Sequence, residues 1–169
     1  MMKPDLQQIP EWYRPYVAVL DDKPIVELLR ESLSSFEQLF GEITEEKSLS
    51  RYAEGKWSIK EVLQHIMDTE RIFAYRALRF SRGDQNDLSG FDQNAYVDQS
   101  MADRRPLAQL IHEFSTIRRA TIALFEGMDD AWLDREGTAN SYSLSVRAIG
   151  YITVGHQVHH VNIIRNKYL

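Results

Sequence analysis

The sequence predicts an all-α protein, an antiparallel four-helix bundle formed as a single domain over residues 1–169. Four long segments repeat apolar residues at helical spacing, and no segment shows the alternating pattern of a half-buried strand. A chain of this length can also bury a sizeable core without disulfides. Because four amphipathic helices can bury their apolar faces only against one another, we expect them to pack side by side.

Residues 1–20 combine prolines with aromatic side chains. Pro10 and Pro15 disfavour a long helix, while the aromatic residues carry too much apolar surface to remain in water. We therefore expect an N-terminal arm, extended and packed on the bundle. An alternative is that Trp12 or Tyr13 lines a pocket.

The first long helix is predicted to begin near Pro24, a residue suited to the first helical position, and to end at Gly41. Residues 42–56 lack periodicity and are expected to form a connection. The second helix spans residues 58–82 and ends before Gly83.

The start of the second helix carries two local signals. Ser58 and Glu61 have the spacing of a capping box, in which each side chain accepts from the other residue's amide. Trp57, just before the cap, can pack back on Val62 as a hydrophobic staple does. His65 then falls on or next to the apolar face of this helix.

Residues 83–105 form a long polar loop between the second and third helices. Loops of this length are usually functional or disordered. Its apolar residues favour a packed crossing segment, which we expect over one end of the bundle: Leu88, Phe91, Tyr96 and Val97.

The third helix is predicted over residues 106–127, and the fourth from Ser143 or Ser145 to Lys167. Between them we expect a short helical turn at 128–133 and a polar loop at 134–142. His112 lies off the apolar stripe of the third helix and is expected at the surface.

The charges give little sign of a macromolecular partner. A formal net charge of −5 provides no basic footprint, so we expect neither nucleic acid nor an anionic membrane as a partner. Arg104–Arg105 and Arg118–Arg119 are interpreted as solvated helix ends and faces, and Glu70–Arg71 as a surface pair. No window approaches the roughly 20 apolar residues of a membrane span and the N-terminus has no signal-like core, so a cytoplasmic location is expected.

The candidate site consists of histidines. His156 and His160 lie four residues apart, which on a helix puts both side chains on one face, roughly 6 Å apart at Cβ. With His65 as the third ligand they match a three-histidine catalytic zinc site, and neutral imidazole also suits copper, iron and nickel. The alternative is that all three are core residues satisfied by hydrogen bonds. His159 points about 100° away from His160 and is expected at the rim.

Two carboxylates lie near enough on the second helix to assist. Asp68 and Glu61 are candidates for acceptors from the His65 ring, for a fourth ligand or for a general base. The alternative for each is an outward position on an amphipathic helix. Because the chain has no cysteine, any thiol chemistry needs a thiol from outside.

Three segments together resemble the DinB/YfiT-like superfamily. Residues 57–66 read WSIKEVLQHI and are similar to its "WS-x-x-E-x-x-x-H-L" signature, while residues 155–160 read GHQVHH and are similar to its "H-x-x-x-H". Residues 88–93, LSGFDQ, resemble the loop that follows the second helix in many members. The resemblance covers the chain from about residue 20.

The resemblance implies a four-helix bundle with an unusual connection order, frequent homodimerisation and one divalent metal ion per chain. The family's ligand positions correspond to His65, His156 and His160. Zinc or nickel is the expected ion, with iron or manganese as further options. Characterised relatives are transferases and isomerases that use a low-molecular-weight thiol such as bacillithiol or mycothiol.

These observations together favour a metal-dependent enzyme that activates an external thiol for transfer to an electrophilic small molecule. A metal-dependent hydrolase, with Asp68 or Glu61 as base, is the second hypothesis. The third is a non-catalytic bundle that binds a metal or a small molecule and acts through a dimer surface.

Overall fold

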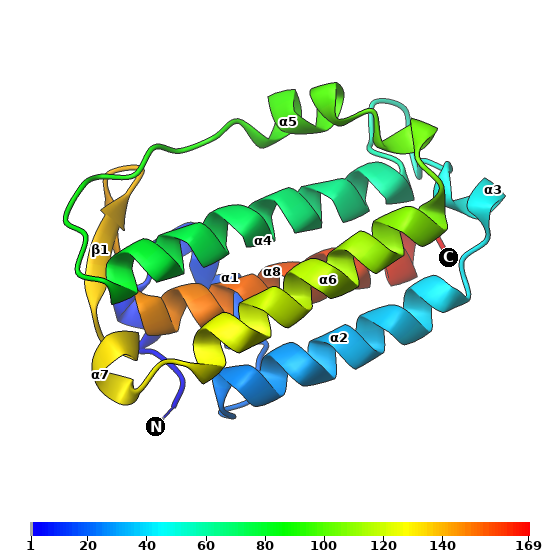
Figure 1. Cartoon of the computed structure of the whole chain (residues 1–169). Helices are drawn as coiled ribbons and strands as arrows, with labels where there is room; N and C mark the ends of the chain where they lie inside the picture. The colour runs from blue at the N-terminus through cyan, green and yellow to red at the C-terminus, as the bar shows by residue number, and fades with distance from the viewer. Residues whose placement is uncertain (1) are drawn as a thin grey trace.

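A computed structural model describes residues 2–169 and has four long helices that lie side by side (Figure 1). Their bounds are α2 (Ile25–Gly41), α4 (Ile59–Ser81), α6 (Leu107–Glu126) and α8 (Val146–Lys167). α4 packs on α6 and α8, and α2 packs on the same two helices, so the four close a ring around the core. The predicted all-α four-helix bundle is confirmed, and each helix forms where its apolar stripe predicted it.

The connection between α4 and α6 determines the order of the bundle. α2 and α8 run in one direction and α4 and α6 in the other, so α6 follows α4 without a change of direction (Figure 1). The chain must therefore travel back along the bundle, and this crossover contains α5 (Gln93–Ser100) and the 3-10 turn η3 (Ala102–Arg104). Our expectation that residues 83–105 cross one end of the bundle is wrong, because they run along the length of α4.

Both ends of the crossover are fastened. Leu88 donates from its amide to the Thr138 carbonyl at 2.9 Å and accepts from the Asn140 amide at 2.8 Å. At the other end, the Asp103 carboxylate accepts from the Ser58 hydroxyl and, at 2.9 Å, from Arg51. These contacts tie the crossover to the loop before α8 and to the start of α4.

A short hairpin precedes α8. β1 (Glu136–Ala139) pairs with β2 (Tyr142–Ser145) in antiparallel register, with Glu136 opposite Ser145. Asn140 and Ser141 form the two-residue turn with φ values of 52° and 65°, as a type I′ turn requires. The polar loop expected over 134–142 is therefore corrected, because β1 and the turn lie within it. These strands are too short and too polar to show an alternating pattern in the sequence.

The N-terminal arm packs on the bundle as expected, but the expectation that it is extended is wrong. It contains the 3-10 turns η1 (Leu6–Gln8) and η2 (Glu11–Tyr13) and the short helix α1 (Arg14–Ala18). Pro15 lies in the first turn of α1, where its missing N–H removes no helical hydrogen bond. α1 packs against α8, where Gly155 allows a close approach.

The helix ends follow the local sequence signals. At α4, Ser58 Oγ accepts from the Glu61 amide at 3.1 Å, and the Glu61 carboxylate accepts from the Ser58 amide at 2.8 Å, so the capping box is formed. Of the two serines proposed to start the last helix, Ser145 is its cap and accepts from Ala148. Two further short helices occur in the connections, α3 (Glu45–Ser48) and α7 (Asp130–Leu133).

The core contains one ion pair that the sequence did not indicate. Arg118 of α6 is fully buried and forms a bidentate pair with Glu70 of α4, with both N–O distances at 2.8 Å. It also donates to Ser32 of α2 and, at 2.9 Å, to Gln157 of α8. The expectation that Arg118 and Glu70 face solvent is therefore wrong, because a fully hydrogen-bonded pair can be accommodated in a core where either residue alone could not.

The sequence neighbours of this pair, Arg119 and Arg71, are exposed, as expected. No helix within residues 2–169 is both long enough and apolar enough to span a membrane.

Candidate metal centre

The three histidines selected from the sequence lie together inside the bundle. His65 comes from α4, and His156 and His160 come from successive turns of α8. The His156 Nε2 atom lies 2.9 Å from His65 Nε2 and 3.1 Å from His160 Nε2. One ring nitrogen from each residue lies within 4.8 Å of the others, a separation at which the trio could hold a single ion.

Burial keeps these rings neutral. It lowers the pKa of His65 to about 4 and that of His160 to about 3, and it lowers the pKa of His156 well below its usual value. Neutral imidazole is the form that binds a metal, because the coordinating nitrogen must keep its lone pair free.

The chemistry of this donor set fits a metal ion better than a hydrogen-bonded trio. Each Nε2 has one site in the ring plane, which holds either a proton or a lone pair. His156 Nε2 faces two other Nε2 atoms, so one hydrogen bond can satisfy only one of its short contacts. An ion coordinated by all three nitrogens would satisfy every one.

A buried hydroxyl near the cluster is also without a partner. Thr69 follows His65 by one helical turn, and side chains on a helix lean toward the preceding turn. Its Oγ1 is the one buried side-chain polar atom in the part of the chain described that has no hydrogen-bond partner. This hydroxyl is therefore a polar group of the core whose hydrogen-bonding capacity is unsatisfied.

Aromatic rings surround the cluster. The Trp57 ring lies 5.0 Å from that of His65, and the Tyr16 ring lies edge-on to His156 at 5.6 Å. Phe73 lies 6.3 Å from His156 on another side. These rings restrict the access of water to the histidine nitrogens.

Tyr16 is the site residue that sequence analysis missed. The signal in the sequence is Gly155, because a glycine inside a helical pattern indicates that another segment packs closely there. In the structure a Cβ at Gly155 would lie 2.1 Å from the Tyr16 carbonyl oxygen. Tyr16 also packs on the exposed His159 at 5.1 Å, which agrees with a rim position for that histidine. Tyr13 packs on Phe73, and Trp12 packs on Tyr142. The aromatic residue of the arm that contacts the histidines is therefore Tyr16, and not Trp12 or Tyr13, the two proposed from the sequence.

The two carboxylates lie near the cluster on α4 but are engaged elsewhere. Glu61 is held by the helix cap and by Arg51. Asp68 accepts from Gln64 Nε2 at 2.9 Å, and burial raises its pKa. Within residues 2–169 neither one hydrogen-bonds to His65. His112 is exposed, as expected.

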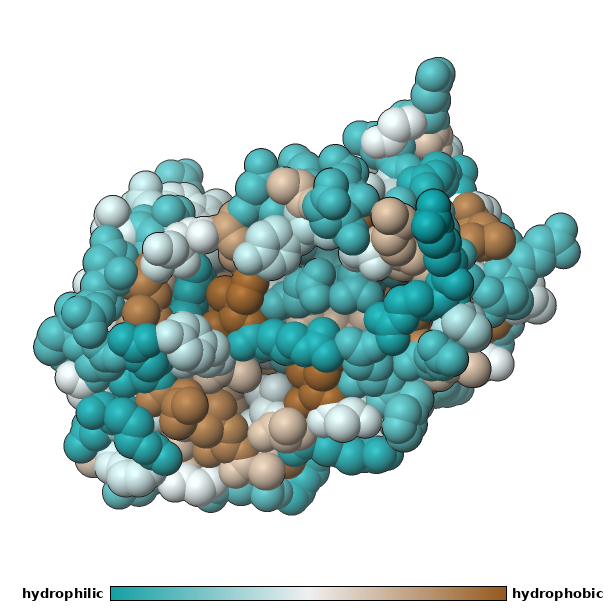
Figure 2. Space-filling view, turned by 45° about the horizontal axis from the view of Figure 1, so that its top comes forward, coloured by the Kyte–Doolittle hydropathy of each residue, from teal (hydrophilic) through white to brown (hydrophobic). Residues whose placement is uncertain are grey.

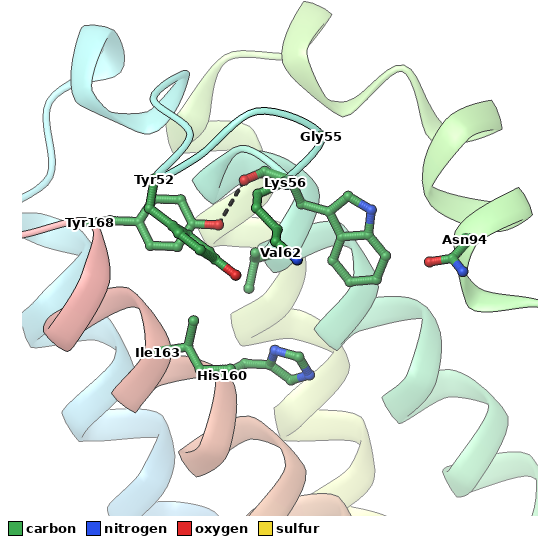
Figure 3. Close-up of a pocket in the computed structure, with 9 residues that line it drawn as sticks. Tyr52, Gly55, Lys56, Val62, Asn94, His160, Ile163 and Tyr168 are labelled. Atoms are coloured by element: carbon green, nitrogen blue, oxygen red, sulfur yellow. Dashed lines mark hydrogen bonds between the residues drawn. The ribbon is translucent and has the colours of Figure 1, made fainter.

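A cavity of about 280 Å³ opens beside His160, between the start of α4, the end of α8 and the crossover (Figure 3). Its lining includes three aromatic side chains and one formally charged residue. The lining residues are Tyr52, Gly55, Lys56, Trp57, Val62, Asn94, His160, Ile163 and Tyr168.

A helical bundle with a histidine cluster between two facing helices defines a class of proteins that build metal sites inside the bundle. Residues 28–164 match the family model of the DinB superfamily. Because this match spans most of the chain, the protein belongs to the DinB superfamily, and the resemblance stated from its motifs is confirmed.

The solved structures that are similar to this one include the following two. One is YfiT from Bacillus subtilis, described as a probable metal-dependent hydrolase with an unusual four-helix bundle topology; the TM-score is 0.71, with 15% identity over 83% of this chain and 84% of that chain. The other is a mycothiol-dependent maleylpyruvate isomerase, with a TM-score of 0.67 and 12% identity over 83% of this chain and 60% of that chain. At these identities the likeness establishes the fold alone. No match is found among curated protein sequences.

Proposed function

We propose that this protein is a metal-dependent enzyme acting on a small molecule, with His65, His156 and His160 as the ligands of one divalent ion. The observation that carries the proposal is the arrangement of three neutral imidazoles with their Nε2 atoms facing one another, which hydrogen bonds alone do not satisfy. The chain has no cysteine to supply a thiolate ligand, and imidazole nitrogen suits borderline ions such as zinc or nickel.

The three histidines would leave one position of a tetrahedral ion open, and the cavity lies on the His160 side. A bound ion would lower the pKa of a thiol or a water in that position. The surrounding residues have separate roles. Trp57, Tyr16 and Phe73 exclude bulk water, and the walls of the cavity hold the substrate next to His160.

Within this class we propose transfer chemistry with an external low-molecular-weight thiol as nucleophile. The absence of cysteine means that the protein supplies no thiol of its own. The description of one structural neighbour as mycothiol-dependent supports the same choice. An ion held at the three DinB ligand positions would favour the thiolate form of a bound thiol. The thiolate is a stronger nucleophile than the neutral thiol.

The second candidate is a metal-dependent hydrolase. YfiT is described as a probable member of that class, and Asp68 offers a carboxylate of raised pKa one helical turn from His65. The third candidate is a non-catalytic bundle that binds a metal. A fourth protein ligand that closes the site would favour this candidate.

Metal analysis tests the proposal first. Untagged protein purified without chelator should contain about one divalent ion per chain, as a three-histidine site requires. His156→Ala and His160→Gln should each lose the ion. Both variants should keep wild-type helix content by circular dichroism. His112→Ala is the matched control, since that residue is exposed, and should keep the ion. A wild-type protein that takes up none of zinc, nickel, iron and manganese would overturn the proposal.

Thiol dependence separates the two enzyme classes. Metal-loaded protein is incubated with electrophilic small molecules in the presence and absence of bacillithiol, mycothiol or a simple thiol. Turnover that requires the thiol supports transfer, whereas turnover of ester or amide substrates without thiol supports hydrolysis.

A further inference from the structure

We propose that the cavity beside His160 binds a small planar organic carboxylate, whose charged group pairs with Lys56 and whose planar part lies among the aromatic walls. This inference rests on the proposed function, because it names the substrate class of the same site. It concerns the cavity walls rather than the metal ligands, so its test can succeed or fail separately.

The charge of the cavity selects an anion. Lys56 is the one formally charged residue in the lining, and no aspartate or glutamate lines it. The Lys56 ammonium forms no ion pair or hydrogen bond within the described residues, whereas the neighbouring Arg51 is neutralised by Glu61 and Asp103. Lys56 is exposed at the mouth of the cavity, and its unpaired ammonium provides a local positive charge that attracts a carboxylate although the whole chain is acidic.

The walls of the cavity select a planar molecule. The Tyr52 and Tyr168 rings meet edge to face with their centroids 5.0 Å apart. The Tyr168 hydroxyl donates to the Trp57 carbonyl at 2.7 Å, which fixes the ring (Figure 3). Burial raises the pKa of Tyr168 to about 12, so this phenol stays neutral and adds no negative charge. Rigid aromatic walls favour stacking with flat groups.

The polar groups give the bound molecule an orientation. Figure 3 shows Lys56 and His160 on facing sides of the cavity, with Asn94 at its edge on α5. A carboxylate held at Lys56 therefore directs the rest of the molecule toward the histidine cluster. The Asn94 carboxamide adds a hydrogen-bond donor, which gives the long crossover a role in substrate binding.

Titration calorimetry with benzoate tests the inference, with benzamide as the uncharged molecule of the same shape. Benzoate should bind the wild-type protein roughly two- to fivefold more tightly than benzamide, as a charge pair with the exposed Lys56 ammonium predicts. Lys56→Gln should lose that preference, and Lys56→Arg should keep most of it. Lys47→Gln, which removes a lysine outside the cavity, should behave as wild type.

Each titration is performed on zinc-loaded and on chelator-treated protein. Benzoate binding that depends on Lys56 in both forms supports the inference, and it does so even if the protein proves to hold no metal. Benzoate binding that needs zinc and is unaffected by Lys56→Gln would show that the carboxylate binds an ion instead, and would overturn it. Equal affinity for benzoate and benzamide, or no binding of either, would also overturn it.

A carboxylate could also belong to the thiol rather than to the planar substrate. The thiol 3-mercaptopropionate carries the same charge without a planar group, so it distinguishes the two sources. The comparison is made on chelator-treated protein, where no ion is present to bind the sulfur. Weaker binding of 3-mercaptopropionate than of benzoate there supports the inference. If 3-mercaptopropionate binds in a Lys56-dependent manner and benzoate does not, the cavity is a thiol site and the inference is wrong.

Discussion

At the scale of single residues, Arg118 and Glu70 form the one ion pair within residues 2–169 whose two side chains are both buried. The pair and its hydrogen bonds join all four long helices. Arg118→Met should lower the free energy of unfolding by about 3–5 kcal/mol, because the Glu70 carboxylate would remain buried without a partner. Urea denaturation followed by circular dichroism measures this change.

Arg119→Met provides the matched control, since Arg119 is the next residue on α6 and its ion pair with Glu37 is exposed. It should change the free energy of unfolding by no more than about 1 kcal/mol. The double variant Arg118→Met with Glu70→Leu should recover most of the loss, because neither charge is then buried. Equal stability of the two arginine variants would contradict the assignment of Arg118 to the core.

Gly155 is the second residue with a large expected effect. Alanine there would place a Cβ 2.1 Å from the Tyr16 carbonyl oxygen, which is backbone and cannot move aside as a side chain can. Gly155→Ala should displace α1, expose the histidine cluster to water and lower the free energy of unfolding by about 1–3 kcal/mol. Gly41→Ala has open space for its Cβ and should not destabilise the protein. Thermal unfolding of the two variants compares them directly.

At the scale of elements, the hairpin before α8 contains a turn of unfavourable composition. Ser141 has a φ of 65°, a value that glycine adopts without strain and serine does not. Ser141→Gly should therefore raise the free energy of unfolding by about 0.5–1 kcal/mol, since Asn-Gly is the preferred type I′ pair. The hydrogen bond from the Ser141 hydroxyl to Asp87 that it removes is long, at 3.3 Å, and exposed, so it offsets little of this gain. Ser143→Gly, in β2, should lower it. A destabilising Ser141→Gly, measured in urea, would contradict this account of the turn.

The elements differ in how well the sequence predicted them. The long helices and the α4 cap follow from patterns within a few residues of each other, so they could be read directly from the sequence. The hairpin and the path of the crossover depend on contacts between distant segments, such as Leu88 with Thr138 and Asp103 with Ser58. Local periodicity carries no information on such contacts.

At the scale of the whole molecule, the candidate site was only partly predictable. His65, His156 and His160 all lie on apolar helical faces, so the wheel positions were enough to select them. Tyr16, by contrast, reaches the cluster because the arm folds back on α8, and Lys56 enters the cavity from a segment without periodicity. The burial of Arg118 and Glu70 also required the bundle, because each residue alone resembles a surface charge.

Because the histidines come from both α4 and α8, the complete ligand set exists only when the bundle is folded. An ion that binds this set therefore stabilises the folded state. Zinc at a free concentration of one hundred times its dissociation constant should raise the free energy of unfolding of chelator-treated protein by about 2.7 kcal/mol. For a chain of this length this corresponds to roughly 5–11 °C in the midpoint of thermal unfolding.

His160→Gln should abolish the zinc-dependent shift while leaving the metal-free midpoint close to that of wild type, because glutamine is polar like histidine and preserves most of its volume. His112→Ala should retain the full shift. Zinc could also bind exposed histidines, and in that case His112→Ala would reduce the effect and His160→Gln would not. A zinc-dependent shift in wild type that is absent only in the cluster variants would place the stabilising ion between α4 and α8, where the proposed chemistry requires it.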